Sequence, residues 1–135
     1  MGTWGVLAFD NDAANDWAYG LDGVHDLSLI QSAFADLEAA GFDYLDQDVA
    51  CNALAACEVL ARLRSHTGYT NAYTEKVDKW VAAHRSAPPA QLVSRGVAAI
   101  DRILGPQSEL RELWEEGEAQ PWLTGVADLR SRLIS

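Results

Sequence analysis

The first 61 residues of the chain contain no lysine and no arginine. They carry eleven acidic residues, so this part has a formal charge of −11. The remaining residues hold all ten basic groups against nine acids, which gives the whole chain a formal net charge of −10. Nucleic acids and anionic membrane surfaces attract proteins that present cationic patches. The charge balance therefore argues against both as partners.

Other scarce features narrow the class of protein. The two cysteines, Cys51 and Cys57, would lie about 240° apart around a helix, which prevents a disulfide between them. Free thiols are typical of the reducing cytosol. The N-terminus has neither the basic nor the apolar segment of a signal peptide, and no uncharged run is long enough to span a membrane. We therefore expect a cytoplasmic protein.

Helical spacing of apolar residues is present along most of the chain. The length of 135 residues and a hydrophobic content of 49% fit one domain with its own core. We predict an all-α, single-domain bundle of about six or seven helices, preceded by a short extended N-terminal arm over residues 1–9. Capping residues, glycines and prolines place the helices near residues 11–19, 26–40, 47–65, 75–85, 89–105, 108–116 and 122–134, with a mild break at Gly125.

The densest polar cluster comprises Asp10, Asn11, Asp12 and Asp16, with Trp17 directly after it. Oxygen ligands at such spacing suit Ca²⁺ or Mg²⁺, but the EF-hand pattern fails because alanine stands at its fifth position and leucine at its twelfth. One interpretation is a helix cap followed by exposed acids. The other is a site for a cation or for a basic side chain of a partner.

Glu58 is the single charged residue in an otherwise apolar helical segment, residues 53–61. A buried carboxylate is costly unless it is paired. One interpretation is a structural pair with Arg62, one helical turn later. The alternative is a functional carboxylate that shares a divalent cation with Asp12 and Asp16. No other cofactor is predicted.

No motif for catalysis occurs in the sequence. His25, His66 and His84 are isolated, and their spacing fits surface or capping roles rather than metal ligation. A nucleophile elbow and a phosphate-binding glycine loop are both absent. The glutamates of residues 109–118 fit a solvated helix face. The five tryptophans are interpreted as core residues, with a partner surface as the alternative: Trp4, Trp17, Trp80, Trp114 and Trp122.

Three parts of the chain form recognisable motifs. Residues 1–17 combine a Trp-Gly pair, an Asp-Asn-Asp triplet and an Asp-Trp pair, residues 55–60 are an alanine-rich helix bearing Glu58, and residues 108–116 and 128–133 are charged amphipathic segments. Together they resemble the bacterial family named domain of unknown function 4259. The resemblance implies a cytosolic, single-domain, mostly helical bacterial protein whose N-terminal arm docks onto the third helix. It implies no activity.

The sequence favours a non-enzymatic protein-binding module that presents an acidic surface to a basic partner, as immunity proteins and antitoxins do. One alternative is a divalent-metal-binding protein or hydrolase that uses Asp12, Asp16 and Glu58. A second alternative is a structural protein that self-associates through exposed tryptophans. The candidate binding residues are Asp10, Asn11, Asp12, Asp16, Trp17 and Glu58.

Overall fold

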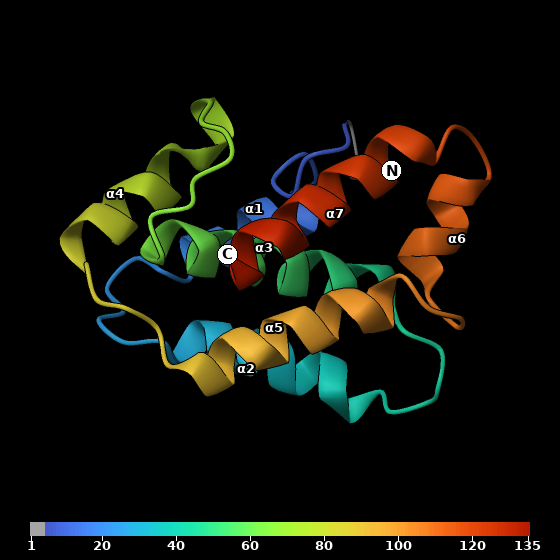
Figure 1. Cartoon of the computed structure of the whole chain (residues 1–135), viewed down its shortest axis with the longest axis horizontal. Coiled ribbons are helices and arrows are strands. Elements are labelled where there is room, and N and C mark those ends of the chain that lie inside the picture. The colour runs from blue at the N-terminus through green and yellow to red at the C-terminus, as the bar shows by residue number, and fades with distance from the viewer. Residues whose placement is uncertain (1–4) are drawn as a thin grey trace.

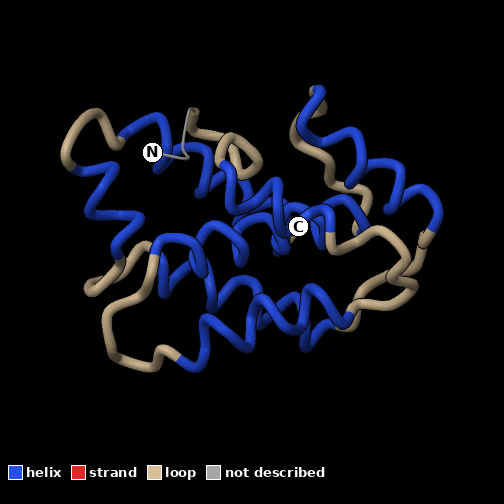
Figure 2. The backbone as a smooth tube through the Cα atoms, turned by 180° about the vertical axis from the view of Figure 1, so that it is seen from behind, coloured by secondary structure: helices blue, strands red, loops and turns tan. Residues whose placement is uncertain are grey.

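A computed structural model describes residues 5–135. Within this range all the regular elements are helices, apart from one isolated β-bridge between Leu45 and Ser108, which confirms the predicted all-α class (Figure 2). The elements in chain order are α1 (Asp12–Tyr19), α2 (Ser28–Ala39), α3 (Gln47–Leu63), the 3₁₀ helix η1 (Ala72–Thr74), α4 (Glu75–Ala83), α5 (Ala90–Ile103), α6 (Glu109–Glu115) and α7 (Gln120–Ile134).

Helix α3 is the centre of the bundle. Every residue from Ala53 to Leu63 is buried, and α1, α2, α5 and α7 all pack against it (Figure 1). Helix α3 is rich in alanine and holds both cysteines, so its small side chains let neighbouring helices approach from several sides. An apolar surface that runs all round a helix requires such a buried position.

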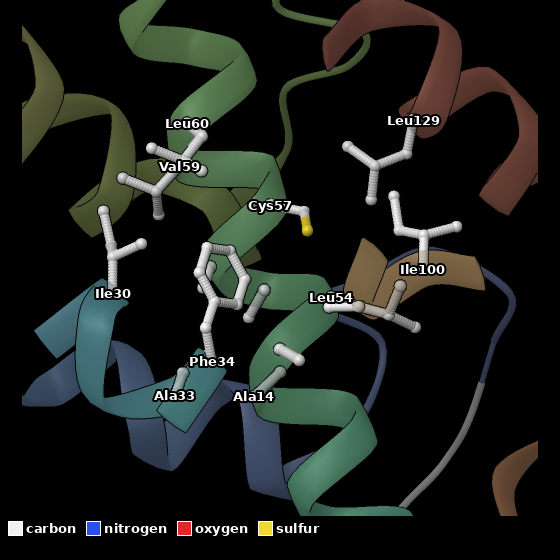
Figure 3. Close-up of a cluster of buried hydrophobic side chains, with 14 of the residues drawn as sticks. Ala14, Ile30, Ala33, Phe34, Leu54, Cys57, Val59, Leu60, Ile100 and Leu129 are labelled. Carbon is white, nitrogen blue, oxygen red and sulfur yellow. The ribbon is translucent and has the colours of Figure 1, made fainter. Parts of the chain in front are cut away.

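The core forms where α2, α3, α5 and α7 meet. Phe34 of α2 is fully buried and points toward α3, while Ile100 of α5 and Leu129 of α7 close the cluster from the other side (Figure 3). Gly96 lets α5 come close, because a Cβ atom there would lie 3.2 Å from the Phe34 ring and 3.3 Å from the Cys57 sulfur. Tight interhelical packing therefore depends on a residue without a side chain.

Several helix starts follow the predicted capping pattern. Asn11 caps α1, and the Asp46 carboxylate accepts hydrogen bonds from the amides of Asp48 and Val49 at the start of α3. Two starts differ. Asp26 accepts from the amide of Ser28, so it folds a turn ahead of α2, which begins only at Ser28. Helix α4 is preceded by η1, whose cap is Asn71.

The predicted extended arm lies partly outside the described residues, since residues 1–4 are not among them. From Gly5 to Asp10 the backbone follows bends and turns. The Asp10 carboxylate accepts from the Leu7 amide at 3.1 Å, and the Asp10 amide donates to the Leu7 carbonyl at 3.0 Å. Aspartate side chains that bond nearby amides favour turns over extended backbone, which explains the difference.

Both cysteines are free, as the sequence predicts, and both are buried in α3. Burial, followed by the charges of Asp48 and Asp46, raises the pKa of Cys51 to about 12. Burial also raises the pKa of Cys57. Neither thiol forms a reactive thiolate at neutral pH. Over residues 5–135, no helix combines the length and the apolar character that crossing a membrane requires.

Helix α7 continues through Gly125, where the sequence predicts a break. A Cβ atom at this position would meet only the Val6 carbonyl oxygen, at 3.9 Å, which is ordinary contact. Because a helix-interior glycine is less stable than alanine, we expect Gly125→Ala to stabilise the protein by about 0.5–1 kcal/mol. Urea unfolding of the two proteins measures this. A loss of stability would show that the space beside α7 is not available to a methyl group.

Candidate functional site

A buried ion network surrounds Glu58. Its side chain is about 2% exposed, and two guanidinium groups share its carboxylate, with Oε2 also accepting from Nη1 of Arg132 at 3.3 Å. Oε2 lies 2.5 Å from Nη1 of Arg62, and Oε1 lies 2.5 Å from Nη2 of Arg132. The pairing with Arg62 predicted from the sequence is therefore present, but a second cation from α7 shares the carboxylate.

Arg62 is itself almost fully buried, and its donors are used. Nε donates to Oδ1 of Asp78 on α4 at 2.9 Å, and Nη2 donates to the Tyr69 carbonyl at 2.5 Å. The other oxygen of Asp78 accepts from the Thr74 hydroxyl at 2.8 Å. These contacts compensate the guanidinium for the water it loses on burial.

Arg132 extends the network toward the surface. Nε donates to Asp128 at 2.9 Å and Nη1 donates to the His66 carbonyl at 3.2 Å. Gly68 lies directly against this guanidinium, since a Cβ atom there would sit 2.5 Å from its central carbon. The network thus joins α3, α4, α7 and the connection between α3 and η1. With both oxygens held by guanidinium groups, Glu58 has the surroundings of a structural ion pair.

The Asp10–Asp16 cluster does not take part in the ion network of Glu58. The Asn11 side chain is buried and accepts from the Ala14 amide at 2.7 Å, whereas Asp12 and Asp16 are exposed on α1. Among residues 5–135, no three histidine, cysteine or acidic side chains are grouped as metal ligands would be. The structure therefore does not bring Asp12 and Asp16 together with Glu58 as ligands of one cation.

The described tryptophans belong to the core, as the sequence analysis predicts. Trp80 and Trp122 are buried, and Trp17 and Trp114 are half-buried against the core cluster. The rings of Trp114 and Trp122 stack with centroids 6.1 Å apart. Trp4 lies outside the described residues. Self-association through exposed tryptophans gains no support from these four.

Two histidines that look isolated in the sequence are paired in the structure. Nδ1 of His25 lies 2.9 Å from Nε2 of His84, although 59 residues separate them. The His84 ring also stacks on Trp80 at 4.5 Å between centroids. Sequence spacing reveals metal ligands that lie near each other in the chain. It could not reveal a pair of histidines from two distant segments, one between α1 and α2 and the other at the end of α4.

An acidic and aromatic surface lies at the end of the molecule opposite α4. Here the connection between α2 and α3 runs beside α6 (Figure 1). Phe42 is fully exposed at 101%, and half-exposed Tyr44 donates its hydroxyl proton to Oε1 of Glu112 at 2.7 Å. We call this the acidic aromatic surface. It comprises Phe42, Asp43, Tyr44, Asp46, Asp48, Glu109, Glu112 and Glu116.

The six carboxylates of the acidic aromatic surface have no ion-pair partner among the lysines and arginines of residues 5–135. Arg102 contacts the connection between α2 and α3, but it donates to carbonyl oxygens there, including those of Gly41 and Asp43, and not to carboxylates. Arg111 pairs with Glu115 on its own helix. Negative charge on this surface therefore remains available to an approaching cation.

The loop that carries Phe42 is held by the backbone as well as by Arg102. The Leu45 amide donates to the Gln107 carbonyl at 2.8 Å, and the Leu45 carbonyl accepts from the Glu109 amide at 3.0 Å. Gly41 turns the chain at a φ of 55°, a conformation that glycine adopts without strain. The exposed phenyl ring is thus presented by a fixed loop, which lowers the entropy lost on binding.

The sequence predicts only the α6 part of this surface. It indicates a solvated acidic face at residues 109–118, and the structure agrees for Glu112, Glu115, Glu116 and Glu118. It gave no role to Phe42 or Tyr44. A bulky aromatic between a glycine and an aspartate, in a connection where a polar residue is usual, is the signal that could have indicated them.

The acidic surroundings make the titration of Tyr44 a direct probe of this surface. Its hydrogen bond to Glu112 and, less strongly, burial and the charges of Glu112, Glu109 and Glu116 raise the pKa of Tyr44 to about 12. A tyrosine pKa raised by folding supports the folded state below pH 10, and this contribution is lost as the pH rises through 12. We expect Glu112→Gln to lower the pKa of Tyr44 toward 10.

Alkaline absorbance titration of the phenolate measures this change. Tyr44→Phe is the control, because it removes the titration that Glu112→Gln is expected to shift. An identical titration curve for the wild type and Glu112→Gln would contradict the hydrogen bond between the two side chains.

The fold and its surfaces define a class: a single-domain, acidic, all-α protein with a buried ion network and no grouped metal ligands among residues 5–135. A family model described as domain of unknown function (DUF4259) matches residues 2–125. The chain therefore belongs to that family. A search of the curated proteins found no match, and a search of the solved structures found none either.

Proposed function

We propose that this chain is a non-enzymatic binding protein that docks a basic protein partner on the acidic aromatic surface. The observation that carries the proposal is the full exposure of Phe42 on a surface that also holds six carboxylates without ion-pair partners among residues 5–135. Exposed apolar patches rimmed by polar groups mark interaction sites on soluble proteins, and Phe42 and Tyr44 expose two aromatic rings here. Because its acids are unpaired, the acidic aromatic surface favours a positively charged partner.

The two kinds of residue have different roles in the proposed complex. The carboxylates attract a cationic surface over several ångströms and speed association, an effect that salt screens. Phe42 supplies an aromatic anchor, the type of residue that often dominates binding energy. An arginine or lysine of the partner can pack over its ring. A small acidic protein of this kind suits the neutralisation of a basic toxin, as an immunity protein or antitoxin does.

Two other acidic residues contrast with those of the acidic aromatic surface. Glu58 is neutralised inside the protein, and Glu38 pairs with Arg95 at 2.9 Å on the surface. That hydrogen bond, opposed by a little burial and assisted by the charge of Arg95, lowers the pKa of Glu38. Both of these acids have a cation beside them, whereas those of the acidic aromatic surface have no ion-pair partner among residues 5–135.

Capture from a lysate of the source organism, followed by kinetics with the purified partner, tests the proposal. We expect one basic protein to bind the wild type, with an association rate that falls steeply as salt rises. Phe42→Ala should weaken affinity about 30-fold, the effect of losing an anchor worth about 2 kcal/mol. Asp43→Asn combined with Asp48→Asn and Glu116→Gln should slow association and flatten its salt dependence.

Matched controls lie away from this surface. Ile134→Ala removes another exposed apolar side chain, and Glu75→Gln removes an exposed acid on α4. Both should bind as the wild type does. If the controls weaken binding as much as the surface variants, or if the partner is acidic and insensitive to salt, the proposed docking surface is wrong. If the partner inhibits growth and this chain relieves the inhibition, the antitoxin-like role is supported.

A further inference from the structure

A cavity of about 120 Å³ lies between the N-terminal segment and helices α3, α6 and α7. Residues 5–8 form one side of it, and Leu54 of α3 and Val126 of α7 lie on others. Three aromatic side chains also line it, and these are Tyr69, Trp114 and Trp122. This cavity is distinct from the acidic aromatic surface: none of that surface's residues lines it, although α3 and α6 contribute to both.

The size and the walls of the cavity indicate what it can hold. An apolar cavity of about 150 Å³ is known to accommodate benzene. At 120 Å³, this one has the dimensions for a single ring with at most a small substituent. Aromatic walls favour an aromatic ring, which stacks or makes edge contacts with them. Leu54 and Val126 add apolar contacts.

The charged groups at the cavity constrain the charge of the ligand. Glu58 and Arg132 both line it, but each oxygen of Glu58 already accepts from a guanidinium at 2.5 Å. A ligand cation would have to compete with Arg132 for Glu58 and Asp128, and a ligand anion would have to compete with these two acids for Arg132. A neutral ligand avoids the cost of burying an unpaired charge.

Tyr69 provides the specific polar contact. Its hydroxyl oxygen accepts from the Phe9 amide at 3.3 Å, while no acceptor for its own proton occurs among residues 5–135. Burial, and then the negative charge of Glu58, raise the pKa of Tyr69, so the hydroxyl stays protonated at neutral pH. A hydrogen-bond donor at an apolar cavity favours a ligand that brings an acceptor.

We propose that this cavity binds a small neutral aromatic molecule of single-ring size, with an oxygen that accepts a hydrogen bond from Tyr69. The aromatic walls hold the ring, the Glu58–Arg132 pair selects against a net charge, and Tyr69 selects for the oxygen. This site is independent of the proposed binding of a basic protein.

Phenol and toluene are the probes, because they have the same size and differ in the oxygen. We expect phenol to bind the wild-type protein with a dissociation constant near or below 1 mM and to raise Tm by about 4 °C at ten times that concentration. Toluene should bind more weakly. Isothermal titration calorimetry gives the affinities, and Trp114 and Trp122 at the cavity provide a fluorescence signal.

Two variants test the location and the hydrogen bond. Gly125 lines the cavity and has open space beside it, so Gly125→Leu should fill the site and abolish the phenol response, while Gly125→Ala is the control for α7 stability. Tyr69→Phe should weaken phenol about 3- to 10-fold and leave toluene unchanged, as expected for one lost hydrogen bond.

Three results would overturn the proposal. Phenol producing no response at 10 mM shows that the cavity does not take such ligands. A response that persists in Gly125→Leu places binding elsewhere. If phenol binds to Trp4→Ala but not to the wild type, the first residues of the chain, and not a ligand, occupy the cavity. If Gly125→Leu does not fold, the selective loss of phenol binding in Tyr69→Phe decides alone.

Discussion

Replacing Glu58 with leucine is expected to lower the free energy of unfolding by about 3–5 kcal/mol. The carboxylate faces two guanidinium groups at 2.5 Å, and the Arg62 side chain is about 1% exposed. Without Glu58, Arg62 keeps only Asp78 as a charged partner in a place that water does not reach. The loss exceeds that of an exposed ion pair, which contributes about 0–1 kcal/mol. Urea unfolding followed by circular dichroism measures it.

A double variant separates the charge effect from the loss of packing. Glu58→Leu combined with Arg62→Met replaces both partners by apolar groups, and we expect it to recover a large part of the lost stability. Glu58→Gln is the milder variant if Glu58→Leu fails to fold, since it keeps the volume and one acceptor. A cost below about 1 kcal/mol for Glu58→Leu would contradict a buried ionised pair.

Truncating Phe34 to alanine is expected to lower the free energy of unfolding by about 3–5 kcal/mol. The ring is fully buried between α2, α3 and α5, and it reaches the close approach made by Gly96. Alanine would leave a cavity among residues that already pack closely, so the neighbours can fill little of it. Chemical unfolding gives the value, and binding of a basic partner should be unchanged because Phe34 is remote from solvent.

Phe34→Leu is the matched control for this prediction. It keeps most of the apolar volume, and we expect it to lose clearly less stability than Phe34→Ala. Equal losses would show that the ring's shape, rather than the volume removed, determines the cost. A loss below 1 kcal/mol for Phe34→Ala would mean that α2 and α5 can collapse onto α3.

Local patterns explain why the helices were predictable. The apolar run of α3, the caps Asn11 and Asp46, and the proline ahead of α5 each depend on residues within one or two turns. The pairing of Glu58 with Arg62 is predictable for the same reason, since residues four apart share a helix face. Some helices begin or end a few residues away from the predicted positions. At Asp26, a side-chain hydrogen bond forms a turn where the sequence predicts the start of a helix.

Contacts between distant segments were not predictable. Arg132 follows Glu58 by 74 residues, and nothing in its surroundings distinguishes it from the nearby Arg130, which pairs with Asp101 on the surface. Tyr44 and Glu112 are 68 residues apart. Packing of whole helices determines both contacts, and the cavity beside Tyr69 results from the same packing.

The Glu58 network has a consequence for biosynthesis. Glu58 and Arg62 are made early, but the second cation of the carboxylate arrives only with Arg132. A chain still being synthesised must therefore keep α3, the helix at the centre of the core, with an acid that lacks part of its counter-charge. Domains complete their folding as units. We expect a chain stopped before residue 128 to remain incompletely folded and to need protection by chaperones until α7 is present.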